Sequence, residues 1–168
     1  YADLDNDGDL DMVVNNANME AFVYRNESDK LLNNNYLQLE LKGSGLNTAA
    51  FGAKIFLRAG GKTFYQEQMP MRGFQSSMDP RPNIGLGDVK QLDTVLVVWP
   101  TGDKMTLLTN VPARQTLKLS QADANVSKTD IPWLMPPGHP LFKNATAAAD
   151  IPWKHEEDPF YDWDRDRL

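Results

Sequence analysis

The chain has 168 residues, of which 41% are hydrophobic and 24% are charged, so it is long and apolar enough to bury a core. Its formal net charge of −6 disfavours nucleic acid as a partner, because phosphate binding needs a basic face. There is no apolar run of the roughly 18 residues that span a bilayer, and we expect this chain not to be transmembrane. The absence of cysteine excludes disulfides and thiolate metal sites.

The chain starts within an acidic loop of the pattern D-x-D-x-D-G-x-x-D, and we expect it to be a piece of a longer protein. Calcium prefers six to eight oxygen ligands, and carboxylates at alternate positions can converge on one point if the loop curls. The glycine allows the sharp turn. We therefore predict a calcium site with side-chain oxygens from four residues and the backbone carbonyl of Asp9. The four residues are Asp3, Asp5, Asp7 and Asp11. The alternative is a solvated acidic turn.

An EF-hand is excluded by the residues that follow this loop. With Asp3 as its first position, the twelfth is Val14, where an EF-hand requires glutamate. Residues 10–14 also indicate a strand and not a helix. The predicted calcium loop therefore leads into a β-strand. Residues 12–34 contain two short apolar stretches and then a polar, Asn-rich run.

Residues 35–120 carry the densest strand signals, with apolar and polar side chains alternating in short runs. Gly60-Gly61 joins two of these runs and predicts a hairpin. The run Val95-Leu96-Val97-Val98 is apolar on both faces, which is typical of a central strand. Gly85-Leu86-Gly87-Asp88 is interpreted as a tight turn. The expected strands are 36–42, 53–58, 62–69, 93–99, 104–108 and 115–119.

The fold class predicted from these patterns is all-β, a small antiparallel β-sandwich or barrel. Residues 121–168 form a Pro- and Trp-rich tail, in which proline density predicts irregular structure. A helical turn is expected at 146–150. This tail is interpreted as a connector that lies along another surface.

Catalytic signals are weak, and we expect the chain not to be an enzyme. The two histidines, His139 and His155, both lie in the tail. Ser76 lies outside any G-x-S-x-G nucleophile elbow. An enzyme would need a pocket that joins His155 to Ser76 or to carboxylates. A different alternative is a carbohydrate-binding module for glycan uptake or degradation, in which Trp133 or Trp153 stacks on sugar rings.

Two family resemblances are carried by motifs. The acidic loop resembles the calcium loop of FG-GAP or VCBS repeats, which are blades of β-propellers. Residues 35–120 resemble the ASPIC and UnbV domain, found in cartilage acidic protein and in bacterial envelope proteins. A departure is Asn83-Ile84, where that family often has His-Phe. The motifs that carry the second resemblance occur in the family's order, and they are Gly52-Ala53-Lys54-Ile55, Gly73-Phe74-Gln75-Ser76, Gly85-Leu86-Gly87, Val97-Val98-Trp99-Pro100-Thr101-Gly102 and Asn110-Val111-Pro112-Ala113-Arg114-Gln115.

These resemblances imply three regions: 1–34 as the end of a propeller repeat with its calcium loop, 35–120 as the ASPIC/UnbV-like domain, and 121–168 as a connector toward a further propeller segment. They imply a partial β-propeller blade at the N-terminus and a non-catalytic binding scaffold that binds Ca²⁺. The location implied is extracellular or in the cell envelope, associated with the outer membrane if the source is bacterial. The partner, protein or glycan, is left open.

Overall fold

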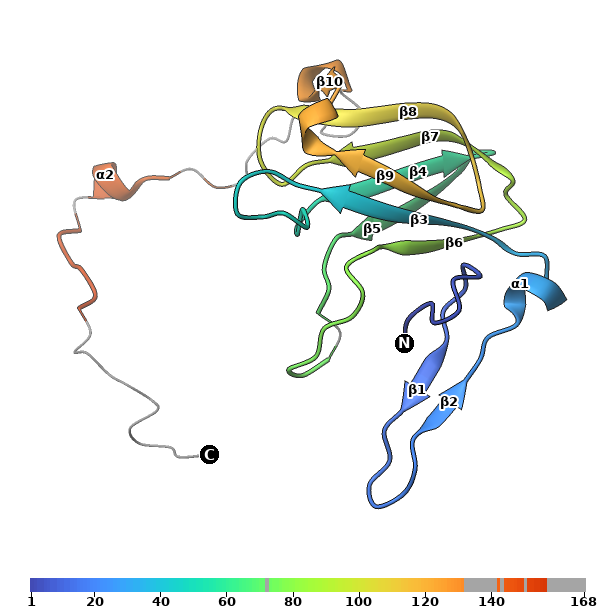
Figure 1. Ribbon diagram of the computed structural model, residues 1–168. Coiled ribbons are helices and arrows are strands. Elements are labelled where there is room, and N and C mark those ends of the chain that lie inside the picture. The colour runs from blue at the N-terminus through green and yellow to red at the C-terminus, as the bar shows by residue number, and fades with distance from the viewer. Residues whose placement is uncertain (72, 132–141, 143, 150, 157–168) are drawn as a thin grey trace. The chain divides into compact units, whose positions relative to one another are not determined.

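The computed structural model describes residues 1–71, 73–131, 142, 144–149 and 151–156 (Figure 1). The chain divides into two compact units, Tyr1–Pro132 and Trp133–Leu168. The tail residues 132–141, which include Trp133 and His139, lie outside the described residues. The same is true of the acidic end, 157–168, with Trp163.

The first unit contains a five-stranded antiparallel sheet with the order β10-β8-β7-β4-β5. β7 is the middle strand, as its apolar run predicted. β4 and β5 are joined through Gly60 and Gly61, whose φ angles of 53° and 78° suit a tight hairpin. The predicted hairpin is therefore confirmed. The strands are β4 (Lys54–Ala59), β5 (Lys62–Glu67), β7 (Gln91–Val98), β8 (Lys104–Pro112) and β10 (Val126–Ser127).

A second, three-stranded sheet has the order β6-β3-β9 and faces the first one (Figure 1). Its strands are β6 (Asn83–Gly87), β3 (Asn35–Lys42) and β9 (Gln115–Ser120). β3 pairs with β6 antiparallel but with β9 in parallel, so this sheet is mixed. The parallel pair departs from the expected antiparallel arrangement. It arises because β3 and β9 belong to distant parts of the chain and no hairpin constrains their direction.

Apolar side chains from both sheets form one core between them. Leu37, Leu39 and Leu41 of β3 are buried, as are Ile55 and Leu57 of β4. This period of two is the one read from the sequence, because alternate side chains of a strand point to the same face. The core confirms an all-β fold and a sandwich. The strands of the described residues close no barrel.

The face of the large sheet that points away from this core is also partly covered. Among the described residues, three buried apolar side chains lie outside the core cluster: Leu96, Met105 and Ile131. Leu96 alternates along β7 with Val95 and Val97, which belong to the core. The strand therefore buries both faces. This explains the unbroken apolar run in its sequence.

The interpretation of Gly85-Leu86-Gly87-Asp88 as a turn is wrong for its first three residues. They belong to β6, which continues to Gly87. Ile84 and Leu86 are buried and Gly85 is exposed, so the segment has the alternation of a strand. The glycines hid this pattern because they contribute no side chain to the outer face. The chain turns after Gly87.

A separate two-stranded sheet precedes the sandwich. β1 (Met12–Val14) and β2 (Phe22–Tyr24) pair antiparallel, and helix α1 (Ser28–Leu31) follows. Large apolar side chains on both faces of this hairpin are exposed. They are Met12, Val13, Phe22, Val23 and Tyr24.

In the second unit, helix α2 (Thr146–Ala149) confirms the predicted helical turn. The Asn144 side chain accepts a hydrogen bond from the Thr146 amide at 3.0 Å. No helix among the described residues has the length and apolar character needed to cross a membrane.

Candidate metal site

The acidic loop, residues 1–11, is closed at its base by a pair of backbone hydrogen bonds. The Ala2 amide donates to the Asp11 carbonyl at 3.2 Å, and the Asp11 amide donates to the Ala2 carbonyl at 2.8 Å. Asn6 and Gly8 have positive φ angles of 60° and 98°. These conformations curl the chain between the two ends of the loop, so side chains at alternate positions turn inward.

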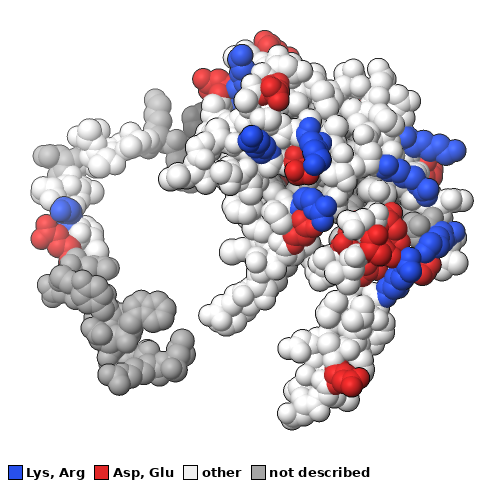
Figure 2. Space-filling view, in the orientation of Figure 1, with Lys and Arg blue, Asp and Glu red and all other residues white. Residues whose placement is uncertain are grey.

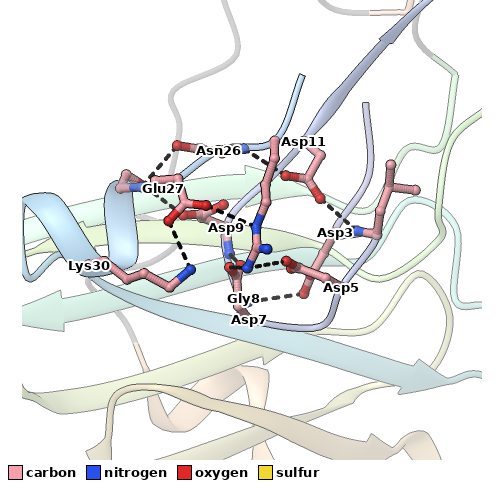
Figure 3. Close-up of polar contacts among 12 residues, drawn as sticks. Asp3, Asp5, Asp7, Gly8, Asp9, Asp11, Asn26, Glu27 and Lys30 are labelled. Atoms are coloured by element: carbon pink, nitrogen blue, oxygen red, sulfur yellow. Dashed lines mark hydrogen bonds and ion pairs between the residues drawn. The ribbon is translucent and has the colours of Figure 1, made fainter. Parts of the chain in front are cut away.

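Three of the predicted ligands converge inside this loop (Figure 3). One carboxylate oxygen from each of Asp3, Asp5 and Asp7 lies within 4.8 Å of the others. The second oxygens of two of them hold the loop itself: Asp3 Oδ2 accepts from the Gly8 amide and Asp7 Oδ1 from the Asp9 amide, both at 3.2 Å. Asp3 Oδ1 is buried and has no hydrogen-bond partner among the described residues. A buried carboxylate oxygen in that state is costly unless a cation offsets it.

The other two predicted ligands lie outside this three-residue group. Asp11 is buried, and its carboxylate accepts the amides of Leu4 at 3.0 Å and Asn26 at 2.8 Å. These backbone hydrogen bonds lower the pKa of Asp11. Its side chain thus links the loop to the end of the hairpin. The Asp9 side chain accepts a hydrogen bond from the Ser28 hydroxyl at 3.0 Å, so its contact is with α1.

Arg25 is the main basic neighbour of the cluster, and no sequence motif indicated it. Its guanidinium lies 2.7 Å from Asp5 and 3.8 Å from Asp7, and it also contacts Glu27 at 3.1 Å. Lys30 binds Glu27 at 2.9 Å, and this contact lowers the pKa of Glu27. Figure 2 shows acidic side chains grouped beside basic ones on this face. The pairing of the two strands is the signal that could have identified Arg25. Met12 pairs with Tyr24, so Arg25, which follows Tyr24, lies opposite the end of the acidic loop.

The loop packs against the sandwich through Gly8. The Asn83 side chain donates to the Gly8 carbonyl at 3.0 Å, and Gly8 is covered by the ring of Tyr36. A β-carbon at position 8 would lie 1.8 Å from Tyr36 Cε1. Burial raises the pKa of Tyr36, and the nearby carboxylates of Asp3 and Asp7 raise it further, while Arg114 opposes this. The acidic loop and the sandwich are therefore electrostatically linked.

We expect Tyr36 to ionise above the ordinary tyrosine pKa of 10.0, and calcium to bring its pKa down. The reason is that a bound cation would offset the charges of Asp3 and Asp7. Absorbance titration of the wild type and of Tyr36→Phe, with calcium or chelator, measures the difference. Because the folded-state pKa lies above the unfolded one, the contribution of Tyr36 to stability is present below about pH 10. It is lost as the pH rises through the folded-state pKa.

Tyr65 provides the control for this titration. Its pKa is also raised, by burial and by Glu67, with no contribution from the loop carboxylates. Calcium should therefore leave the ionisation of Tyr65 unchanged, as measured with Tyr65→Phe. An equal calcium shift for both tyrosines would contradict the link between Tyr36 and the loop.

The two residues considered for catalysis, Ser76 and His155, belong to different units of the chain. Ser76 is exposed, and its hydroxyl donates to the Phe74 carbonyl at 3.1 Å. His155 belongs to the second unit, where its ring lies 5.7 Å from that of Trp153. Trp153 is 74% exposed, whereas Trp99 is 1% exposed in the core. Trp133, the other candidate for stacking, lies outside the described residues.

Comparison with known families gives one match. The sequence profile described as ASPIC and UnbV matches residues 43–126, half of the chain. The matched segment starts inside the predicted middle region, 35–120, and ends in β10. It leaves out the acidic loop, for which no FG-GAP or VCBS repeat is matched. No curated protein matches the chain.

Proposed function

The chain belongs to the ASPIC and UnbV family, and from this starting point we propose that it is a non-catalytic, calcium-binding interaction module of a secreted or envelope-exposed protein. The observation that carries the proposal is the Asp3, Asp5 and Asp7 group, in which a buried oxygen of Asp3 has no hydrogen-bond partner among the described residues. Like charges held this close repel one another unless a cation lies between them.

The donor set fits calcium better than other metals. Calcium is a hard cation that takes carboxylate and carbonyl oxygens, and the described part of the loop offers neither thiolate nor imidazole. Asp3, Asp5 and Asp7 would hold the ion through their side chains, and Asp9 through its backbone carbonyl. Asp11 was predicted as a fourth side-chain ligand. Its contacts with backbone amides support a role in holding the ends of the loop.

The hairpin supports a role in assembly. We propose that residues 1–34 are part of an FG-GAP or VCBS propeller blade, as their sequence resemblance implies. A two-stranded sheet alone is marginally stable in water, and β1 and β2 expose apolar side chains on both faces. Such surfaces mark sites of interaction. Calcium would fix the loop from which this hairpin starts, so binding of the ion and presentation of the hairpin would be coupled.

The experiment that tests the calcium site is calorimetric titration of calcium into chelator-treated protein. We expect a dissociation constant on the order of 10⁻⁴ to 10⁻³ M, the range of extracellular modules. An Asp5→Ala, Asp7→Ala double variant should lose binding, because two of the converging carboxylates are removed. An Arg25→Gln variant should bind more tightly, because its guanidinium no longer competes for the same carboxylates.

The matched control is an Asp103→Ala, Asp123→Ala double variant, which removes the same number of carboxylates at exposed positions outside the acidic loop. It should bind calcium as the wild type does. If calcium does not bind to the wild type, this chain has no calcium site in the loop. If the control variant loses binding as the Asp5 and Asp7 variant does, the binding is not specific to the loop.

A further inference from the structure

A cavity of about 210 Å³ lies beside the acidic loop, and of the three converging carboxylates it is lined by Asp3 but not by Asp5 or Asp7. It is bounded by the start of the chain, by β3, by the end of β5 and by the segment that leads into β6. Four of its lining residues carry side-chain amides: Gln38, Gln66, Gln68 and Asn83. Neutral hydrogen-bonding groups therefore make up about a third of the side chains that line this cavity.

Two of these amides are almost fully buried and are fixed at one end. Gln38 is 4% exposed, and its Oε1 accepts a hydrogen bond from the Thr116 hydroxyl at 2.9 Å. Gln68 is also 4% exposed, and its Nε2 donates to the carbonyls of Ala49, at 3.1 Å, and Pro80. The other polar atoms of these two amides, Gln38 Nε2 and Gln68 Oε1, have no hydrogen-bond partner among the described residues. Gln38 thus offers a donor and Gln68 an acceptor.

The other two amides extend this pattern. Asn83 donates through Nδ2 to the Gly8 carbonyl, which leaves its Oδ1 as an acceptor. The Gln66 side chain makes no hydrogen bond with any described residue, although it is only partly exposed, so both of its ends are available. The cavity therefore presents donors and acceptors side by side. A hydroxyl group matches such a surface because it donates and accepts at once.

Two of the charged side chains that line the cavity, Asp79 and Arg81, are paired with each other. Arg81 Nε lies 3.0 Å and 2.9 Å from the two carboxylate oxygens of Asp79, and its guanidinium forms an ion pair with the same group. The hydrogen bond from Arg81 lowers the pKa of Asp79, so this carboxylate stays charged beside its partner. The one other carboxylate among the lining residues is that of Asp3. The lining side chains therefore offer an anionic ligand no cation beyond the guanidinium already paired with Asp79.

We propose that this cavity binds a neutral polyhydroxylated ligand of about the size of one hexose. Its volume is below the roughly 300–1,000 Å³ of pockets for drug-sized molecules, which restricts the occupant to about one ring. Tyr1, Met69 and Met78 supply apolar surface for the C–H faces of a sugar. The inference goes beyond the calcium site, with which the cavity shares only Asp3. It assigns sugar recognition to residues of the first unit instead of to Trp133 or Trp153.

Saturation-transfer NMR on the full chain in calcium-containing buffer tests this proposal. The probes are the methyl pyranosides of glucose, galactose and mannose, with glucuronate as the anionic comparison. We expect saturation transfer to at least one neutral pyranoside, at millimolar affinity, and weaker transfer to glucuronate. No transfer to any neutral pyranoside, or stronger transfer to glucuronate, would overturn the proposal.

Variants locate the binding. Gln66→Leu should weaken it about tenfold, because a lining amide is replaced by an apolar group of similar size. Gln91→Leu, at an exposed position that begins β7, is the matched control and should bind like the wild type. Asn83→Ala, whose side chain also lines the cavity, gives a second test. Binding that survives both cavity variants, or that is lost equally in the control, would show that the sugar binds elsewhere.

Discussion

Replacing Trp99 with alanine is expected to lower the free energy of unfolding by about 3–5 kcal/mol, the cost typical of removing a buried tryptophan. Its side chain is 1% exposed and belongs to the core between the two sheets. The surrounding strands are held by their ladders and cannot collapse fully into the space left behind. Because this loss is a large fraction of the stability of a single domain, the variant should be close to unfolding.

The contribution of the Trp99 hydrogen bond to stability can be measured separately from the contribution of its packing. The indole Nε1 donates to the Thr106 hydroxyl at 3.0 Å in a buried position. Thr106→Val keeps the branched shape but leaves the indole N–H without its partner, which should cost about 1–3 kcal/mol. The loss should be smaller than that of Trp99→Ala.

Urea unfolding followed by circular dichroism measures both effects without relying on tryptophan fluorescence. Trp153→Ala is the control, because that indole is 74% exposed and its removal should change stability by about 0.5 kcal/mol at most. Equal losses for Trp99→Ala and Trp153→Ala would contradict the position of Trp99 in the core.

Replacing Gly8 with alanine is expected to detach the acidic loop from the sandwich and to weaken calcium binding tenfold or more. The new β-carbon would lie 1.8 Å from Tyr36 Cε1 and 2.0 Å from Cζ, far inside contact distance. The φ of Gly8, 98°, is also one that alanine adopts only with strain, worth about 1–3 kcal/mol. Since Asp3 holds the Gly8 amide, a shift of Gly8 displaces a predicted calcium ligand as well. Calorimetric titration with calcium measures the loss of affinity, and thermal unfolding measures the loss of stability.

Gly45→Ala is the control that isolates the clash from the strain. Gly45 also has a positive φ, 60°, but a β-carbon there would meet no atom within 4 Å. That variant should lose some stability and bind calcium normally. Tyr36→Ala added to Gly8→Ala should restore part of the calcium affinity, because the clashing ring is gone. If Gly8→Ala binds calcium like Gly45→Ala, the loop is not positioned by Tyr36.

The sequence by itself determined the features that depend on near neighbours. Alternation in 36–42 placed Leu37, Leu39 and Leu41 on one buried face, because the side-chain period of a strand is two. Gly60-Gly61 determined a hairpin, since both residues tolerate positive φ. The spacing of Asp3, Asp5 and Asp7 around one turn was enough to bring their carboxylates together.

Tertiary structure decided what depends on residues far apart in the chain. The parallel pairing of β3 with β9 joins segments that local patterns cannot relate, because a strand's periodicity fixes its buried face and not its partner. Arg25 reaches the acidic loop only through the hairpin register, and Tyr36 and Asn83 only through docking of the loop. The amide-lined cavity has the same origin. The strand pattern of the sequence does not show that Gln38 and Gln68 are buried, since burial is a property of the folded chain as a whole.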